Sequence, residues 1–222
     1  AVTHELRTPL ASIRLMAETL ERRLADQPGA RDYPRRIVRA ADGLSFLVDN
    51  ILSFNRLEKE RFRPTLEAVD LAELVRPIVA ELAEDAPRTL VVDVDGLAGV
   101  RVRGDRELLR LLFGNLARNA VHYNDREPIR VRFEAERAGA AWTVRVTDNG
   151  WGIPEVDRRR VFDDFTRAPR PEHEAVAGTG LGLAICRRVA RLHGGTIRVV
   201  ASSPQGTTFA VCLGAADREA GP

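Results

Sequence analysis

The amino-acid sequence predicts an α-helical hairpin followed by an α+β sandwich, in which helices cover one face of a mixed sheet. Apolar residues recur every three or four positions as far as about residue 60, which is typical of amphipathic helices. From about Val69 onwards, helical stripes are mixed with short runs of alternating apolar and polar residues, which are typical of strands. An arginine-rich junction containing Pro64 separates the two patterns. We therefore expect a helical hairpin over residues 1–62, a second domain over 63–214 and a flexible tail over 215–222.

The predicted hairpin carries two apolar stripes. The first consists of Leu6, Leu10, Ile13, Ala17, Leu20 and Leu24, and turn-forming residues at 26–29 end it. The second consists of Ile37, Ala41, Leu44, Val48, Ile51 and Leu52. Because two amphipathic helices cannot enclose a core, we expect the hairpin to pair with a second copy as a four-helix bundle.

In the second domain we expect three helices, over residues 70–85, 105–123 and 181–192. The expected strands cover residues 90–94, 100–103, 129–136, 142–147, 196–200 and 207–213. Residues 149–180 contain glycine and proline at intervals that do not suit one continuous element. Asp70 and Glu73 have the spacing of a helix N-cap.

The composition excludes several classes of protein. With 44% hydrophobic and 30% charged residues, the chain can build a packed core rather than remain disordered. A net charge of +2 argues against a dedicated nucleic-acid binder. Two cysteines, Cys186 and Cys212, are too few for a disulfide framework and indicate a reducing compartment. No run approaches the ~18 apolar residues of a membrane span, so we expect this fragment to be cytoplasmic without membrane contact, any anchor lying upstream.

Residues 148–153, Asp-Asn-Gly-Trp-Gly-Ile, place a carboxylate at the end of a predicted strand, with two glycines after it. The glycines allow a sharp turn and close approach to a ligand. Asp148 can accept a hydrogen bond from an exocyclic amine such as that of adenine. Taken alone, the motif fits a tight turn with a capping aspartate equally well.

Residues 178–183, Gly-Thr-Gly-Leu-Gly-Leu, precede and open a predicted helix. Backbone N–H groups and the helix dipole favour phosphate at such a position. No Lys-Ser/Thr follows, which excludes a P-loop, and no strand lies immediately upstream as in a dinucleotide-binding unit. A hinge is the alternative interpretation.

Asn115, Asn119, His122 and Tyr123 fall on or near one face of a predicted helix, because Asn119 lies four positions after Asn115, and His122 and Tyr123 lie three and four positions after Asn119. A carboxamide oxygen is a hard ligand that suits Mg²⁺. The alternative is a solvated helix face, which the surrounding leucines disfavour.

His4 is followed by Glu5, by Thr8 one turn later and by Pro9. An imidazole is a good nucleophile near neutral pH, and an adjacent carboxylate can take its proton or fix its tautomer. The Thr8 hydroxyl can orient a water from the same helix face. Taken alone, a structural role is the commoner one for such a histidine.

In this order and spacing, the four segments resemble the motifs of two-component sensor histidine kinases, over their dimerisation and catalytic core. Residues 4–10 resemble the H box, 115–123 the N box, 148–153 the G1 box and 178–183 the G2 box. Residues 161–165, Val-Phe-Asp-Asp-Phe, resemble the F box. The resemblance extends from His4 to about Leu213.

The resemblance implies a sandwich of the Bergerat ATP-binding type and phosphorylation of His4 by Mg-ATP. It implies transfer onward to an aspartate of a response regulator receiver domain, and a homodimer formed by the hairpin. Glu5 would act as base or orienting group, Thr8 would support phosphatase activity towards the regulator, and Arg167 would neutralise charge at the γ-phosphate. The implied nucleotide-binding residues are Asn115, Asn119, His122, Tyr123, Asp148, Gly150, Gly152, Ile153, Phe165, Gly178, Thr179, Gly180, Leu181 and Gly182, with Asn119 as the Mg²⁺ ligand. Residues 163–178 would form an ATP lid anchored by Phe162 and Phe165, for which core packing is expected as well.

His122 departs from the family pattern, because many relatives carry a phosphate-contacting lysine at this position. A neutral histidine offers one donor and no permanent charge. Either a protonated His122 or the lid arginines, Arg167 and Arg170, would compensate. We expect nucleotide affinity to be weaker and more pH-sensitive than in lysine-bearing relatives.

Two other classes of function stay open. One is a kinase-like dimeric scaffold that has lost turnover, since a fold alone does not establish activity. The other is an ATPase or serine kinase of the same fold, which would leave the His4 segment without a use.

Overall fold

The computed structural model describes residues 13, 15–20, 22, 24, 32–58, 62–86, 88–166 and 180–216. The chain divides into two compact units, Ala1–Lys59 and Glu60–Pro222. In the first unit, residues 15–20 are helical and α2 spans Asp32–Leu57. Both helices agree with the predicted hairpin.

The apolar stripe of α2 is only partly covered. Ala41 is buried, whereas Ile37, Leu44 and Ile51 are 43%, 49% and 43% exposed. These three residues lie seven positions apart, so they share one helix face. The single chain therefore leaves an apolar line along α2.

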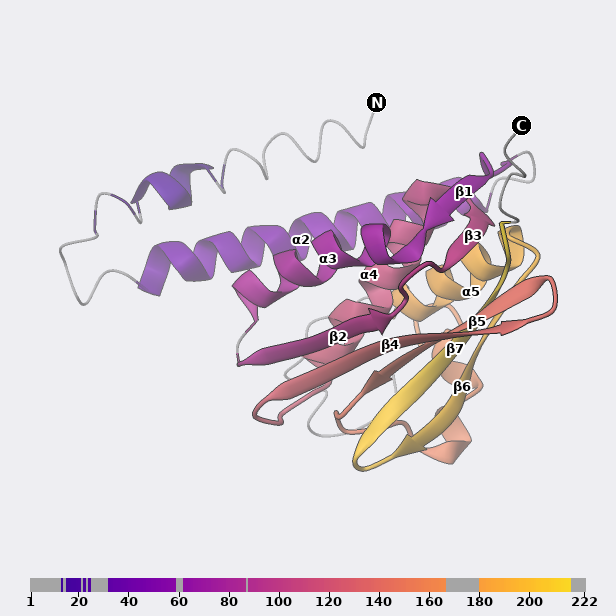
Figure 1. The fold of residues 1–222 in the computed structure, drawn as a ribbon. Coiled ribbons are helices and arrows are strands. Elements are labelled where there is room, and N and C mark those ends of the chain that lie inside the picture. The colour runs from indigo at the N-terminus through magenta and orange to yellow at the C-terminus, as the bar shows by residue number, and fades with distance from the viewer. Residues whose placement is uncertain are drawn as a thin grey trace. The chain divides into compact units, whose positions relative to one another are not determined.

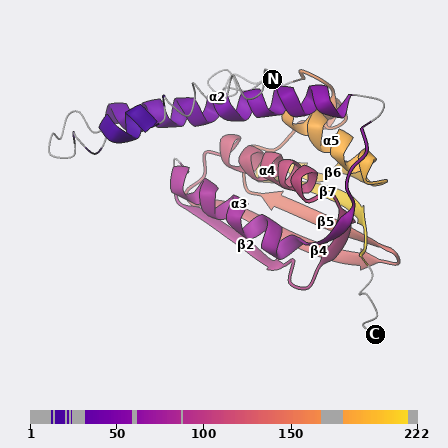
Figure 2. The ribbon, with the colours of Figure 1, turned by 90° about the horizontal axis from the view of Figure 1, so that it is seen from above.

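The second unit is built on a five-stranded sheet in the order β2-β4-β5-β7-β6. Its strands are β2 (Leu90–Gly96), β4 (Ile129–Ala138), β5 (Ala141–Asp148), β6 (Thr196–Ser203) and β7 (Gly206–Gly214). β2 runs parallel to β4 and the other neighbours are antiparallel, so the sheet is mixed. The helices α3 (Leu71–Asp85), α4 (Arg106–His122) and α5 (Gly182–Leu192) lie over one face of it (Figures 1 and 2). The predicted α+β sandwich is confirmed.

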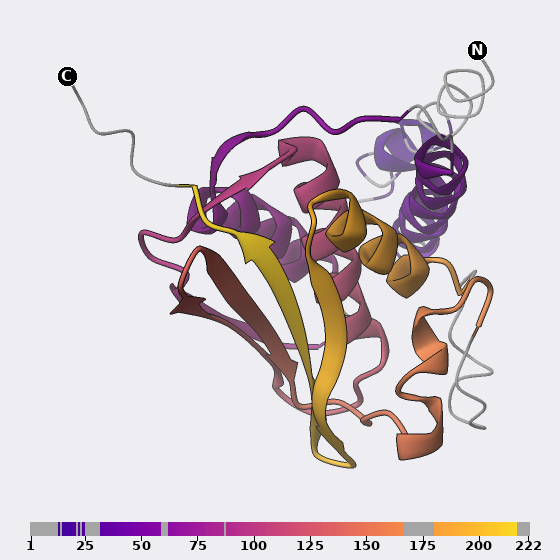
Figure 3. The same ribbon diagram turned by 90° about the vertical axis from the view of Figure 1, so that its right-hand side faces the viewer.

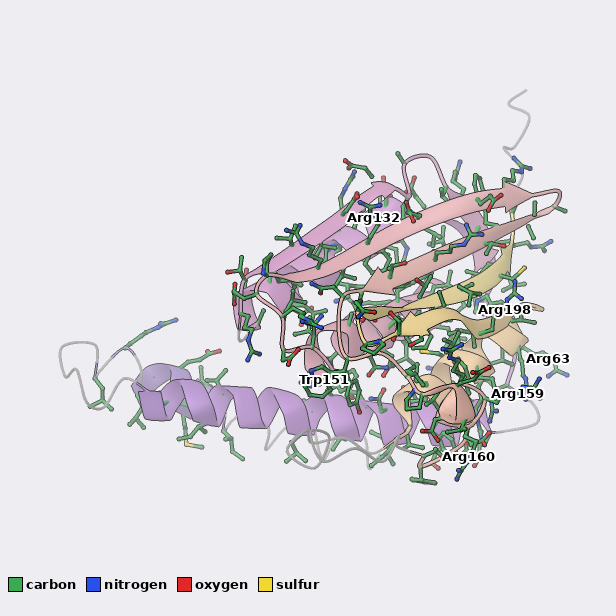
Figure 4. All side chains as sticks on the ribbon, turned by 90° about the horizontal axis from the view of Figure 1, so that it is seen from below. Arg63, Arg132, Trp151, Arg159, Arg160 and Arg198 are labelled. Atoms are coloured by element: carbon green, nitrogen blue, oxygen red, sulfur yellow. The ribbon has the colours of Figure 1, made fainter. Side chains whose placement is uncertain are left out.

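Alternation along the strands decides which face of the sheet is covered. In β4, Ile129, Val131 and Phe133 are buried while Arg130 and Arg132 between them are exposed. Phe133 packs edge-on against Phe113 of α4, with 6.5 Å between ring centroids. The opposite face is polar, and Arg132 on it forms an ion pair with a β2 aspartate at 3.2 Å (Figure 4). Burying one face against helices and solvating the other is the usual solution for such a sheet.

Three features were not predicted. A short strand β1 (Glu67–Asp70) pairs antiparallel with β3 (Arg101–Gly104). The chain end joins this pair, because Ala215 bridges Val102 and the Ala216 N–H donates to the Arg101 carbonyl at 3.0 Å. The expectation of a flexible tail is therefore wrong for residues 215 and 216, since backbone hydrogen bonds hold them. The described part of the irregular segment after β5, residues 149–166, contains two 3₁₀ turns, η1 (Glu155–Asp157) and η2 (Arg160–Phe162).

The starts of α3 and α4 are capped by aspartates. Asp70 Oδ1 accepts from the Glu73 N–H at 3.0 Å, as predicted. Asp105 caps α4, and its own N–H donates to His193 Nε2 at 2.9 Å. His193 Nδ1 lies 2.7 Å from the Val189 carbonyl. The imidazole therefore ties the start of α4 to the end of α5, with its proton on Nδ1.

Within the described residues, no helix is both long and apolar enough to cross a membrane.

Candidate functional site

The turn that follows β5 (the Asp148 turn, residues 148–153) is fixed by its second residue. Asn149 Oδ1 accepts from the Arg130 N–H at 2.8 Å and from Asn124 Nδ2 at 2.9 Å. Asn149 Nδ2 donates to the Pro128 carbonyl at 3.1 Å. With its amide satisfied on both sides, Asn149 anchors the turn to the loop that follows α4, so Asp148 is the candidate functional group of the pair.

Asp148 is half-buried at the end of β5. Its Oδ1 accepts from the Gly150 N–H at 2.8 Å and from the Thr207 N–H at 3.3 Å. Burial raises the pKa of Asp148 to about 6, although these two hydrogen bonds act in the opposite direction. Both bonds go to Oδ1, so in the described part of the chain Oδ2 has no hydrogen-bond donor. Near neutral pH the site therefore presents an ionised acceptor.

The glycines of the Asp148 turn are required by close backbone contacts. Gly152 has φ 74°, and a Cβ there would lie 1.9 Å from the Ser203 carbonyl oxygen. A Cβ at Gly150 would lie 2.4 Å from the Tyr123 carbonyl oxygen. The turn is thus packed between the end of α4 and the β6–β7 hairpin, whose tip lies beside the 3₁₀ segment (Figures 1 and 3).

The aromatic side chains at this turn contact each other. Tyr123 and Trp151 meet edge-on with ring centroids 6.4 Å apart. The Trp151 N–H donates to the Tyr123 carbonyl at 3.1 Å. Trp151 itself projects from the loop after β5 (Figure 4). The structure therefore brings two predicted segments, residues 115–123 and 148–153, into direct contact.

Sequence reasoning missed three residues that support the turn from the other side. Ser202 Oγ accepts from the Ile153 N–H at 2.6 Å and lies 3.2 Å from Thr207 Oγ1. Arg158 Nη2 donates to the Ser202 carbonyl at 2.7 Å. Ser202 and Thr207 come from the β6–β7 hairpin, and no local sequence pattern connects them with residues 148–153.

The asparagines of α4 occupy different environments. Asn115 is 1% exposed and its Nδ2 donates to the Leu111 carbonyl at 2.9 Å. Its Oδ1 would lie 2.6 Å from a Cβ at Gly182, so only glycine allows α5 to begin so close to α4. Asn119, one turn later, is half-buried. Asn115 therefore joins the helices, whereas Asn119 is the amide that a bound group can reach.

His122 is neutral near pH 7. Burial, and secondly the positive charge of Arg118, lower the pKa of His122, although much of its surface remains exposed. The lysine that many relatives carry here would be replaced either by a protonated His122 or by the lid arginines. The lowered pKa of His122 argues against the protonated histidine.

The predicted F-box phenylalanines differ. Phe162 is buried and packs edge-on against Phe209, with 6.2 Å between ring centroids. Phe165 is 69% exposed, so the expectation of core packing is wrong there. Its backbone lies in the left-handed region, with φ 58°, so the chain turns at Phe165. The Phe165 ring is therefore exposed although the Phe162 ring is buried.

The acidic residues between these phenylalanines bind α5. Asp163 pairs with Arg187 at 2.9 Å, and Asp164 pairs with Arg188 at 3.0 Å. Of the predicted residues at the α5 start, Gly180, Leu181 and Gly182 are described, and Leu181 is buried. His4, Glu5, Thr8, Arg167, Arg170, Gly178 and Thr179 lie outside the described residues.

The donor set for a metal is small. Among the described residues, no group of three or more His, Cys, Asp or Glu side chains could hold a metal ion. The Asn119 carboxamide is a hard oxygen ligand, so it fits a Mg²⁺ whose other ligands are phosphate oxygens and water.

Two family models match the chain. Residues 104–217 match the model of the histidine kinase-, DNA gyrase B- and HSP90-like ATPases. Residues 1–60 match the His Kinase A (phospho-acceptor) domain. The chain belongs to the sensor histidine kinases.

Two mycobacterial sensor kinases are similar to the chain over nearly its whole length. The chain is 34% identical over 213 residues to the sensor-like histidine kinase SenX3 of Mycobacterium tuberculosis, covering 96% of this chain and 52% of that protein. It is 33% identical over 219 residues to the sensor histidine kinase MtrB of Mycobacterium leprae, covering 96% of this chain and 38% of that protein. The chain thus spans about half the length, or less, of these sensor kinases.

A solved structure is similar over nearly the whole chain. Full-length ShkA in complex with AMPPNP superposes with a TM-score of 0.69 at 27% identity, covering 97% of this chain and 45% of that one. A helical phospho-acceptor part followed by an ATPase-type sandwich is therefore the fold of this sensor kinase core.

Proposed function

We propose that the chain is the kinase core of a two-component sensor, which binds Mg-ATP on its second unit and phosphorylates His4. The observation that carries the proposal is the Asp148 carboxylate, held on Oδ1 by the Gly150 and Thr207 N–H groups at 2.8 and 3.3 Å, with Oδ2 facing no protein donor among the described residues. An ionised acceptor in a half-buried site suits the amino group of adenine. The AMPPNP complex of ShkA supports an ATP-type ligand.

The remaining described residues extend the nucleotide site from Asp148. Gly150 and Gly152 let the turn pack against the Tyr123 and Ser203 carbonyl groups, which fixes where Asp148 lies, and the Tyr123 ring lies against Trp151. Asn119 would hold Mg²⁺, and Gly180 to Gly182 would border the phosphates at the start of α5. The metal, when bound, neutralises charge on the phosphates.

The transfer step uses the His4 ring as nucleophile. A bond forms between a ring nitrogen and the γ-phosphorus, the bond from that phosphorus to the β–γ bridging oxygen breaks, and ADP leaves. Glu5 takes the ring proton or fixes the tautomer, and Arg167 neutralises the charge on the transferring group.

The onward step regenerates the kinase. An aspartate oxygen of a response regulator receiver domain attacks the phosphorus, and the nitrogen–phosphorus bond breaks. Thr8 would orient the water that later hydrolyses the regulator's acyl phosphate. Because ATP and receiver domains are cytoplasmic, we place this core in the cytoplasm.

A homodimer through the helical hairpin belongs to the same proposal. Ile37, Leu44 and Ile51 are 43%, 49% and 43% exposed along one face of α2. A line of apolar residues at seven-residue spacing is the pattern that a partner helix covers.

The test is incubation with γ-labelled ATP and Mg²⁺, followed by acid and alkali treatment. The expected label is acid-labile and alkali-stable, and His4→Ala abolishes it while Asp148→Asn abolishes nucleotide binding. A folded dimer that binds nucleotide but takes no label would favour the scaffold instead.

Phosphatase activity is tested separately. Thr8→Ala is expected to retain autophosphorylation and to slow dephosphorylation of the phosphorylated regulator. Equal dephosphorylation rates with both proteins would contradict the role given to Thr8.

A further inference from the structure

Arg158 joins two segments that are far apart in the chain. It follows η1 and is half-buried. Its Nη2 donates to the Ser202 carbonyl at 2.7 Å, and its Nε donates more weakly to the Ile153 carbonyl at 3.5 Å. One planar guanidinium thereby holds the end of the Asp148 turn and the end of β6, a geometry that arginine provides and lysine does not.

A series of polar contacts connects Ser202 with the Asp148 carboxylate. The Ile153 N–H donates to Ser202 Oγ at 2.6 Å, and Ser202 Oγ lies 3.2 Å from Thr207 Oγ1. The Thr207 N–H then donates to Asp148 Oδ1 at 3.3 Å. This last bond is the longest of the three, so it is the first to be lost if the β6–β7 hairpin shifts.

We propose that Arg158 is a positioning residue for nucleotide binding, which holds the β6–β7 hairpin against the Asp148 turn and so keeps the Thr207 amide on the Asp148 carboxylate. Arg158 acts through the protein and touches no ligand. The inference rests on the proposed function, in which Asp148 receives the adenine amino group.

The neighbouring arginines provide a contrast. Arg159 and Arg160 are exposed on the same turn (Figure 4), whereas the Arg158 guanidinium donates to two carbonyl groups. A run of three arginines is commonly a solvated patch, but here only the first of them bridges the Asp148 turn and the hairpin. Arg159→Gln is therefore a matched control for removing one positive charge from this turn.

The proposal predicts a change in pH profile as well as in affinity. The hydrogen bond from the Thr207 N–H is one of the two hydrogen bonds that lower the pKa of Asp148. In the described residues the shift arises from burial and these two backbone groups, with no charged side chain among its causes. Losing the Thr207 contact therefore raises the pH at which Asp148 becomes a competent acceptor.

The experiment compares the full chain with Arg158→Gln, Arg158→Lys and Arg159→Gln. A fluorescent ATP analogue is titrated in the presence of Mg²⁺ from pH 5 to pH 8, and each protein's melting temperature is recorded. Arg158→Gln is expected to weaken binding roughly tenfold, the effect of one charge-assisted hydrogen bond, and to move the midpoint of the binding profile to higher pH. Arg158→Lys recovers part of both changes, and Arg159→Gln matches the wild type.

Two results would overturn the proposal. One is wild-type affinity and midpoint in Arg158→Gln. The other is a lower melting temperature and weaker binding with an unmoved midpoint, which would make Arg158 a stability residue only. Asp148→Asn separates this outcome from failure of the proposed function, because a variant that still binds nucleotide normally would refute the adenine role itself.

Discussion

Replacing Asp148 by asparagine is expected to stabilise the second unit at pH 8, although under the proposed function it should remove nucleotide binding. Burial raises the pKa of Asp148 from 3.8 to about 6. Since one pKa unit is worth ~1.4 kcal/mol, ionising Asp148 in the folded protein lowers the free energy of unfolding by up to ~3 kcal/mol. The folded pKa lies above the unfolded one, so this loss begins as pH rises past about 4 and is complete above about 6. Asparagine keeps an oxygen for the Gly150 and Thr207 N–H groups and carries no charge.

Denaturant unfolding followed by tryptophan fluorescence measures this effect. Both tryptophans, Trp142 and Trp151, lie in the second unit, so the signal reports that unit alone. The free energy of unfolding should be similar for the two proteins at pH 4, and higher for Asp148→Asn at pH 8. Asp95→Asn removes an exposed carboxylate and is the control. A difference that is the same at both pH values, or a less stable variant at pH 8, would refute the reasoning.

Three further predictions concern the helices of the second unit. His193→Ala removes the acceptor for the Asp105 N–H and should lower the free energy of unfolding by ~1–3 kcal/mol, measured in urea; an unchanged midpoint would contradict it. Gly182→Ala places a Cβ 2.6 Å from Asn115 Oδ1, so we expect roughly tenfold weaker nucleotide binding, measured by titration; equal affinity would show that α5 can move away freely. His122→Lys adds a permanent charge and should tighten ATP binding several-fold at pH 7.5, with a smaller effect on ADP; an equal effect on both nucleotides would place the new charge away from the γ-phosphate.

The sequence predicted the elements with a clear period and missed those without one. α4 and α5 were predicted within one or two residues, because their apolar stripes are continuous. β1 (Glu-Ala-Val-Asp) buries one residue and shows no alternation, whereas the equally short β3 belongs to an alternating Val-Arg-Val-Arg run over 100–103 and was predicted. Phe162 and Phe165 look alike in the sequence, and only the backbone turn at Phe165 separates the buried ring from the exposed one.

The candidate site shows the same division. Asp148 and the glycines after it form one continuous motif, so the sequence indicates them as candidate site residues. The Thr207 N–H that reaches Asp148 is 59 residues away in the chain and is a backbone group, so its residue type carries no signal. The Arg158 contacts are likewise set by strand pairing and by a 3₁₀ turn. Local motifs thus indicated candidate functional groups, and sheet topology supplied the groups that position them.

In the proposed site, Asp148 at the adenine end would act when ionised, and His122 at the phosphate end would act when protonated. The sign of the pH dependence of nucleotide affinity therefore shows which of the two residues governs binding. In the proposed site Asp148 accepts the adenine amino group best when ionised, so its titration near pH 6 is expected to make affinity rise with pH. His122 would attract phosphate only when protonated, so its titration would make affinity fall with pH. Because burial and Arg118 lower the pKa of His122, its contribution fades before neutral pH is reached. Affinity should therefore rise from pH 5.5 to 7 and then level off, which leaves charge neutralisation at the phosphates to arginine and Mg²⁺ rather than to the residue in the lysine position.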